Sequence, residues 1–130
     1  MPTTDIGGKL RVVSQLISGG LESKVFLVSW ANNNFDTHAN QVNASDPTLG
    51  NHANLLGDLS DAVGAFMKDM ANLGLEDKVA GMTFSEFGRR VAENGSIGTD
   101  HGTAAPLFVF GSDVNGAVYG NDPDLENLDN

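Results

Sequence analysis

The segment VAGMTFSEFGRR (79–90), followed one loop later by GTDHG (98–102), is central to this sequence. Its apolar first half predicts a buried strand. A carboxylate and two arginines follow that strand, and a glycine-flanked Asp-His pair comes next. Because ligands in open α/β sheets bind outside the carboxyl ends of the strands, the sequence places its chemistry here. An earlier segment, FDTH (35–38), repeats the arrangement after an earlier apolar run.

Composition indicates one globular domain. The chain has 130 residues, of which 40% are hydrophobic and 18% charged. A net charge of -10 argues against nucleic acid and anionic membranes as partners, because proteins bind phosphate groups through Lys and Arg side chains. The lack of cysteine excludes disulfides and thiolate metal sites. No apolar run approaches the roughly 18 residues of a membrane span, and no signal peptide opens the sequence. We expect a single domain over residues 1–120 and an acidic tail over residues 121–130.

Apolar periodicity predicts two helices. In residues 9–18, Leu10, Val13 and Ile17 recur at helical spacing, and the Gly-Gly pair that follows is a stop signal. Residues 52–73 form a longer amphipathic stretch, which Gly74 closes. We interpret its methionines and phenylalanine as core residues rather than cofactor contacts.

Three apolar runs predict strands, over residues 24–30, 79–84 and 107–111. The first is almost unbroken, as in a parallel sheet buried on both faces. With the long helix between them, the first two runs predict a right-handed βαβ unit. We expect a long functional loop over residues 31–51, and a short helical turn over residues 89–93 before an Asn-Gly turn.

Two Asp/His groups are candidate metal ligands. Asp36 and His38 are two residues apart, so in extended backbone both side chains point to one side and can reach one ion. Asp100 and His101 are adjacent and need a turn to converge, for which the flanking glycines supply backbone freedom. Alternatively, Asp36 or Thr37 caps a helical turn beside a solvated His38, and residues 98–102 form an ordinary Gly-Asp turn. Both alternatives remain open.

Three other side chains could take part. His52, at the start of the long helix, could face the same crevice or simply cap the helix. Glu86 could bind metal or act as a general base, or it could pair with Arg89 or Arg90. Arg89 could hold an oxyanion or form a structural salt bridge.

Several common sites are missing from the sequence. It has no dinucleotide-binding glycine fingerprint, phosphate-binding loop, paired-histidine zinc motif or nucleophile elbow. Ser85 lies at a predicted strand end but lacks the glycine context of an activated nucleophile. Dinucleotide enzymes, kinases, zinc proteases and α/β-hydrolases are therefore disfavoured.

The longer motifs match a known family. These are FDTHANQ (35–41), His52 with the leucine pair at 55–56, MTFSEFGRR (82–90) and GTDHGTAAP (98–106). Together and in this order they resemble the bacterial domain-of-unknown-function family fifteen-oh-one, which is often labelled sulfatase-like. The resemblance extends from about Leu10 to Gly120.

The resemblance implies a place near the alkaline phosphatase and sulfatase superfamily, whose members are metal-dependent hydrolases. It makes Asp36 with His38 one metal-binding set and Asp100 with His101 another. The superfamily spaces its first set more widely, which leaves His38 and His52 in competition. Its nucleophile lies on an early strand that this chain does not contain, so we expect a C-terminal part of the family's fold. Family members commonly carry a twin-arginine export signal, which implies a periplasmic or exported location.

We therefore predict an α/β fold, as a partial three-layer α/β/α domain with a mostly parallel, alkaline-phosphatase-like sheet. The predicted activity is metal-dependent hydrolysis of a small phosphate or sulfate ester, incomplete in this chain, with zinc, manganese or calcium as the divalent metal. The predicted metal ligands are Asp36, His38, Asp100 and His101; Glu86 is the predicted catalytic residue, and Arg89 and His52 are predicted to bind substrate. The alternative is a non-catalytic module that binds a ligand or a protein. An unpaired strand edge would also favour a homodimer.

Overall fold

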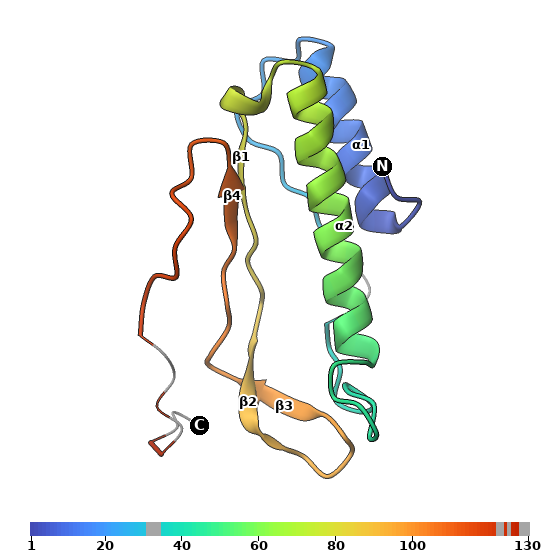
Figure 1. Cartoon of the computed structure of the whole chain (residues 1–130), viewed down its shortest axis with the longest axis vertical. Helices are drawn as coiled ribbons and strands as arrows, with labels where there is room; N and C mark the ends of the chain where they lie inside the picture. Colours follow the sequence, from blue (N-terminus) through green and yellow to red (C-terminus); the bar gives the residue numbers. More distant parts are fainter. Residues whose placement is uncertain (31–34, 122–123, 125, 128–130) are drawn as a thin grey trace.

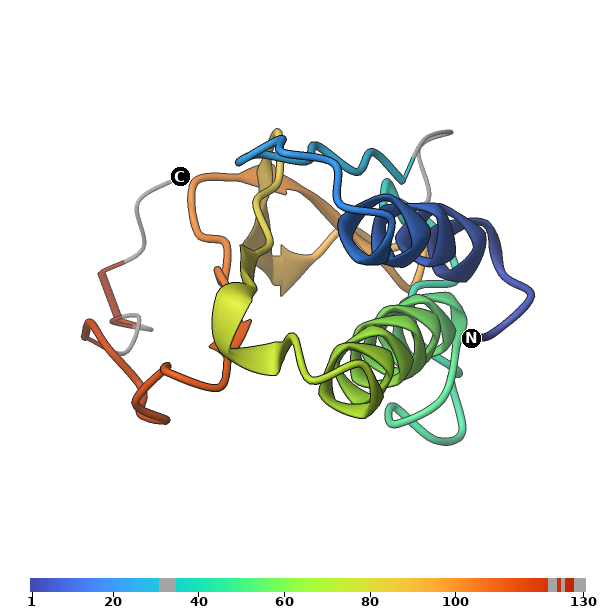
Figure 2. The same ribbon diagram turned by 90° about the horizontal axis from the view of Figure 1, so that it is seen from above.

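The structure is a computed structural model that describes residues 1–30, 35–121, 124 and 126–127 (Figure 1). Its two α-helices form one layer, and its short strands lie to one side of them (Figure 2). The elements in chain order are α1 (Asp5–Ser18), α2 (Asn51–Asn72), the 3-10 helix η1 (Glu76–Lys78), β1 (Ala80–Met82), β2 (Gly88–Glu93), β3 (Thr99–Gly102) and β4 (Val109–Gly111).

Local signals set the ends of both helices. The Thr4 side chain caps α1 by accepting a hydrogen bond from the Gly7 backbone N–H, so the helix begins four residues before the predicted start. The predicted stop is confirmed: Gly19 is the C-cap, and Gly20 follows with a φ of 81°. The predicted end of α2 is confirmed as well, since Gly74 adopts a φ of 67° directly after the C-cap.

The hydrophobic core lies between α1 and α2, which run side by side in both views (Figures 1 and 2). Its buried members are Ile6 and Leu10 from α1, and Ala62, Phe66 and Met70 from α2. Ser14 of α1 donates a hydrogen bond to the Asp69 carboxylate of α2 across this interface. The core role expected for the phenylalanine and methionines of the long helix is confirmed for Phe66 and Met70, which are buried.

The strands form two separate antiparallel pairs. Met82 of β1 pairs with Val109 of β4, and Gly88 of β2 pairs with Gly102 of β3. The β2–β3 ladder is irregular between Arg89 and Glu93. The third predicted strand is confirmed in part, as β4.

The predicted three-layer α/β/α fold with a mostly parallel sheet is wrong. The sheets within the described residues are the two antiparallel pairs, and helices cover one side only. The physical reason lies in residues 24–30, the first predicted strand. In the structure these residues belong to no strand. Because this run pairs with no described strand, α2 does not cross over between parallel strands, and β1 pairs with β4 instead.

Two further local predictions are corrected. Residues 89–93 form strand β2 rather than a helical turn, because they pair with the chain that returns after the Asn94-Gly95 turn. The apolar runs are not covered on both faces: Val25 is 81% exposed and Phe84 is 68% exposed. Part of the predicted loop, residues 31–34, lies outside the described residues. No helix in the described parts of the chain combines the length and the apolar character that crossing a membrane requires.

Candidate metal centre

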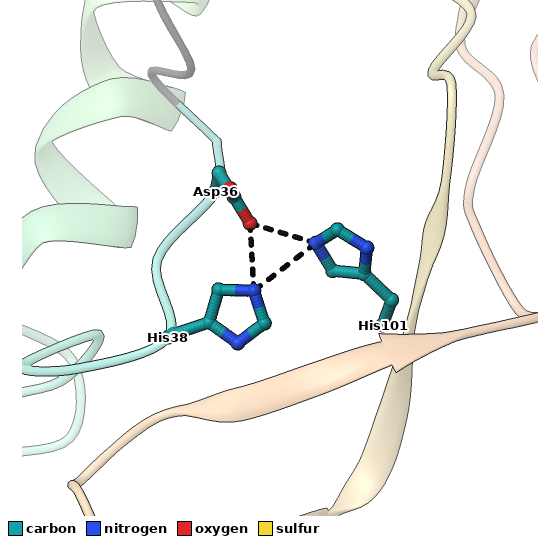
Figure 3. A group of neighbouring side chains, drawn as sticks. All are labelled: Asp36, His38 and His101. Carbon is teal, nitrogen blue, oxygen red and sulfur yellow. Dashed lines mark hydrogen bonds and ion pairs between the residues drawn. The ribbon is translucent and has the colours of Figure 1, made fainter.

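Two segments far apart in the sequence bring the candidate ligands together. Asp36 and His38 lie in the chain that leads into α2, and His101 lies on β3 of the β2–β3 hairpin. Their side chains converge from opposite sides (Figure 3). The structure thus unites members of both predicted Asp/His groups.

The three facing atoms form a small triangle. The Asp36 carboxylate oxygen Oδ1 is 2.7 Å from Nε2 of His101 and 2.9 Å from Nε2 of His38. The two Nε2 atoms are 3.2 Å apart. Donor atoms that share a tetrahedral zinc ion at ~2.0–2.1 Å are about 3.3–3.4 Å apart, so an ion requires the shortest edge of the triangle to lengthen by about 0.6 Å. Two imidazoles and one carboxylate suit zinc or manganese better than calcium, which prefers oxygen ligands.

Backbone contacts hold the two segments against each other. The Asn40 N–H donates to the Ser96 carbonyl at 3.1 Å, and the Gln41 N–H donates to the Ile97 carbonyl at 2.8 Å. Gly98 lies directly against the His38 carbonyl, where any Cβ would collide with it. The glycine is therefore needed for close approach rather than for turn flexibility alone.

Arg89 joins the same two segments through its side chain. Its guanidinium donates to the Phe35 carbonyl at 2.6 Å, to the Thr99 carbonyl at 2.5 Å and to Asp36 Oδ1 at 3.2 Å. The Arg89 side chain is only 16% exposed. The structural salt bridge left open by the sequence therefore exists, with Asp36 rather than Glu86 as its partner.

Asp100 contacts the site from behind His38. Its Oδ1 is 3.1 Å from Nδ1 of His38, the ring nitrogen that does not face the triangle. The same oxygen accepts a hydrogen bond from the Asn94 side-chain amide at 3.1 Å. Asp100 is thus adjacent to the triangle without being one of its three atoms.

Aromatic contacts orient His101. The Phe87 ring stacks on the imidazole with centroids 3.8 Å apart and planes 10° apart. The Arg89 guanidinium carbon lies 5.2 Å from the Phe87 centroid. His38 stacks on His101 at 4.8 Å. These contacts limit rotation of the imidazole and keep Nε2 directed at Asp36.

Both aspartates are held in their charged form. The hydrogen bond from His101 lowers the pKa of Asp36, and the nearby charges of His38, His101 and Arg89 lower it further against the opposing effect of desolvation. Hydrogen bonds from Asn94 and then from His38 lower the pKa of Asp100. An ionised carboxylate is the form that binds metal.

His52 and Glu86 lie outside the triangle. His52 makes an edge-to-face contact with Phe35 at 5.5 Å, and its buried Nδ1 has no hydrogen-bond partner among the described residues. Desolvation, followed by the charge of Arg89, lowers the pKa of His52. Glu86 is exposed in the chain between β1 and β2. The catalytic role predicted for Glu86 and the substrate-binding roles predicted for His52 and Arg89 stay predictions.

Sequence reasoning missed two residues of the site. Phe87 had no assigned role, and Asn94 was interpreted only as part of a turn. Asn94 does make that turn, since its Oδ1 accepts from the Ser96 N–H at 3.0 Å. Its amide also donates to the His38 carbonyl at 2.8 Å, a contact across 56 positions of sequence that no local pattern encodes.

The comparison with protein families agrees with these motifs. Residues 16–128 match the family described as "Protein of unknown function (DUF1501)". The chain belongs to the DUF1501 family. No curated protein and no solved structure matches the chain. Because the family description assigns no activity, the expected link of this DUF1501 chain to the alkaline phosphatase and sulfatase superfamily stays a prediction.

Proposed function

We propose that this chain provides a divalent-metal site, formed by Asp36, His38 and His101, for hydrolysis of phosphate or sulfate esters. The metal is zinc or manganese rather than calcium, because two of the three donors are imidazole nitrogens.

The observation that supports this proposal most directly is that the donor atoms of Asp36, His38 and His101 converge on one point. If both rings direct N–H groups at the shared Asp36 oxygen, those N–H groups also face each other across 3.2 Å. If either ring lacks that proton, its lone pair faces the carboxylate instead. Hydrogen bonds among the three groups therefore leave one unfavourable contact, which a cation between them would remove.

The surrounding residues favour a cation at this position. Arg89 and the Phe35 and Thr99 carbonyls hold Asp36 and β3 in register, which limits the reorganisation that binding needs. A bound divalent ion would supply Lewis acidity toward an ester oxygen and would activate a water molecule. The three side chains would bind and orient the ion, and Arg89 would hold Asp36 in place.

The test is metal content and affinity of the whole chain. After dialysis against zinc, manganese and calcium in separate samples, we expect near-stoichiometric zinc, weaker manganese and no calcium by elemental analysis. His101→Ala and Asp36→Ala should reduce zinc to background. Asp46→Asn is the matched control, because Asp46 is a partly exposed loop residue whose side-chain hydrogen bonds stay within its own turn, with Thr48.

Hydrolysis is measured separately from binding. The zinc-loaded chain is assayed with nitrophenyl phosphate and nitrophenyl sulfate, beside His101→Ala. Turnover that disappears in the variant supports the hydrolase proposal. Stoichiometric zinc with no turnover would favour the non-catalytic binding module, and unchanged zinc content in His101→Ala would contradict the site itself.

A further inference from the structure

His38 is contacted by carboxylates on both edges of its ring. Nε2 faces Asp36 at 2.9 Å, and Nδ1 faces Asp100 at 3.1 Å. A histidine that binds metal through one nitrogen normally donates a hydrogen bond from the other, which sets the tautomer and the ring orientation. Asp100 occupies the position of that acceptor.

Asn94 in turn holds Asp100. Its side-chain Nδ2 donates to Asp100 Oδ1 at 3.1 Å and to the His38 carbonyl at 2.8 Å. Its Oδ1 accepts from the Ser96 N–H, and its backbone N–H donates to the Gly98 carbonyl at 3.0 Å. Asn94 therefore holds three parts of the site together: the hairpin turn, the His38 backbone and the Asp100 carboxylate.

We propose that Asn94 and Asp100 are an outer positioning pair that keeps the proton on Nδ1 of His38 and leaves Nε2 for the metal. Asp100 acts through His38 and does not bind the ion. The inference rests on the proposed function, and it assigns to Asp100 a role different from the ligand role implied by the resemblance.

Asp100 is poorly placed to be a ligand itself. Its Oδ1 already contacts the Asn94 side-chain amide and Nδ1 of His38, the ring nitrogen that does not face the triangle. The ion and Asp100 therefore contact different nitrogens of one imidazole.

Four variants test the pair. Asp100→Ala removes the acceptor, whereas Asp100→Asn retains an acceptor oxygen and should restore part of the effect. Asn94→Asp retains the turn, because a carboxylate oxygen can still accept from Ser96, but it removes both side-chain donations. Asn94→Ala removes all side-chain contacts. Because the Asp100 side chain is 54% exposed, we expect its variants to fold, with helical content checked by circular dichroism.

Two readouts are needed. Zinc affinity, measured by competition with a coloured chelator, should fall about 10–100-fold in Asp100→Ala and Asn94→Asp, and less in Asp100→Asn. Long-range proton–nitrogen NMR spectra report which ring nitrogen carries the proton. We expect Nδ1 of His38 to be protonated in the unchanged protein with and without zinc, and this preference to weaken in Asp100→Ala. A merely structural role would not change the protonated nitrogen.

The outcomes separate this inference from the proposed function. Unchanged zinc affinity in Asp100→Ala and Asn94→Asp, or a proton on Nε2 of His38 in the zinc-bound unchanged protein, would overturn the positioning pair while the metal site stands. Loss of stoichiometric zinc in Asp100→Ala even at saturating metal would make Asp100 a ligand and also overturn it. If the unchanged protein binds no zinc, the proposed function and the inference both fail.

Discussion

The α1–α2 pair and the β2–β3 hairpin are built by different interactions. The helices bury apolar side chains along a continuous interface, and Met70 and Ala62 have no exposed surface. The hairpin buries almost nothing, and its contacts to residues 35–41 are hydrogen bonds, ion pairs and the stacking of His38 on His101. Hydrophobic burial therefore supplies stability in one region, whereas polar geometry organises the other.

The contrast predicts that the two regions respond differently to substitution. Core variants should lower the free energy of unfolding and leave zinc affinity unchanged while the protein is folded. Site variants should lower zinc affinity with smaller effects on stability. Three substitutions test this separation.

The largest expected effect is that of Met70→Ala in the core. Met70 is completely buried, so truncation leaves a cavity and should cost about 2–5 kcal/mol of unfolding free energy. Urea denaturation followed by circular dichroism measures this loss, with the half-exposed Val12→Ala as control. A loss below about 1 kcal/mol would show that this interface is not the stabilising core.

Arg89→Lys should give an intermediate effect on both properties. Lysine cannot reproduce the three hydrogen bonds of the guanidinium, so we expect about 1–3 kcal/mol of destabilisation and about 10–100-fold weaker zinc binding through Asp36. Arg11→Lys is the matched control, because Arg11 is exposed on α1 and donates to the Met1 carbonyl. An increase in KM for ester with unchanged zinc affinity would instead support the predicted anion-binding role of Arg89.

The smallest effect concerns the pH dependence of stability through His52. Its pKa is lowered in the folded chain, so the unfolded state binds more protons just below the usual histidine value of about 6.5. Stability should therefore decline as pH falls through this window, and His52→Gln should remove that part of the decline. Lowered pKa values of Asp36 and Asp100 act only in the more acidic range of carboxylates. An identical slope in both proteins near pH 6 would contradict the prediction.

The two regions also differ in how far sequence could predict them. Helix α2 was predicted to within one residue at each end, because its periodicity and Gly74 are local signals. The strand pairing was not predictable in the same way. Residues 24–30 have the composition of a buried parallel strand, but pairing depends on partners distant in sequence.

The site was predictable by residue type rather than by geometry. Neighbouring Asp and His residues predicted metal ligands, and the structure brings donor atoms of Asp36, His38 and His101 within 4.8 Å of one another. The sequence could not show that Asp100 faces the far side of His38, or that Arg89 donates its hydrogen bonds to carbonyls of two segments. These features depend on the docking of segments about sixty positions apart.

The separation of Asp36 and His101 in the sequence has a consequence for folding. They are 65 positions apart, and α2 lies between them, so their meeting closes a long loop whose entropy opposes it. A metal ion held by both would act as a reversible cross-link that stabilises the folded chain in proportion to the logarithm of its concentration. Such a cross-link would hold the weakly packed β2–β3 hairpin against the segment that leads into α2.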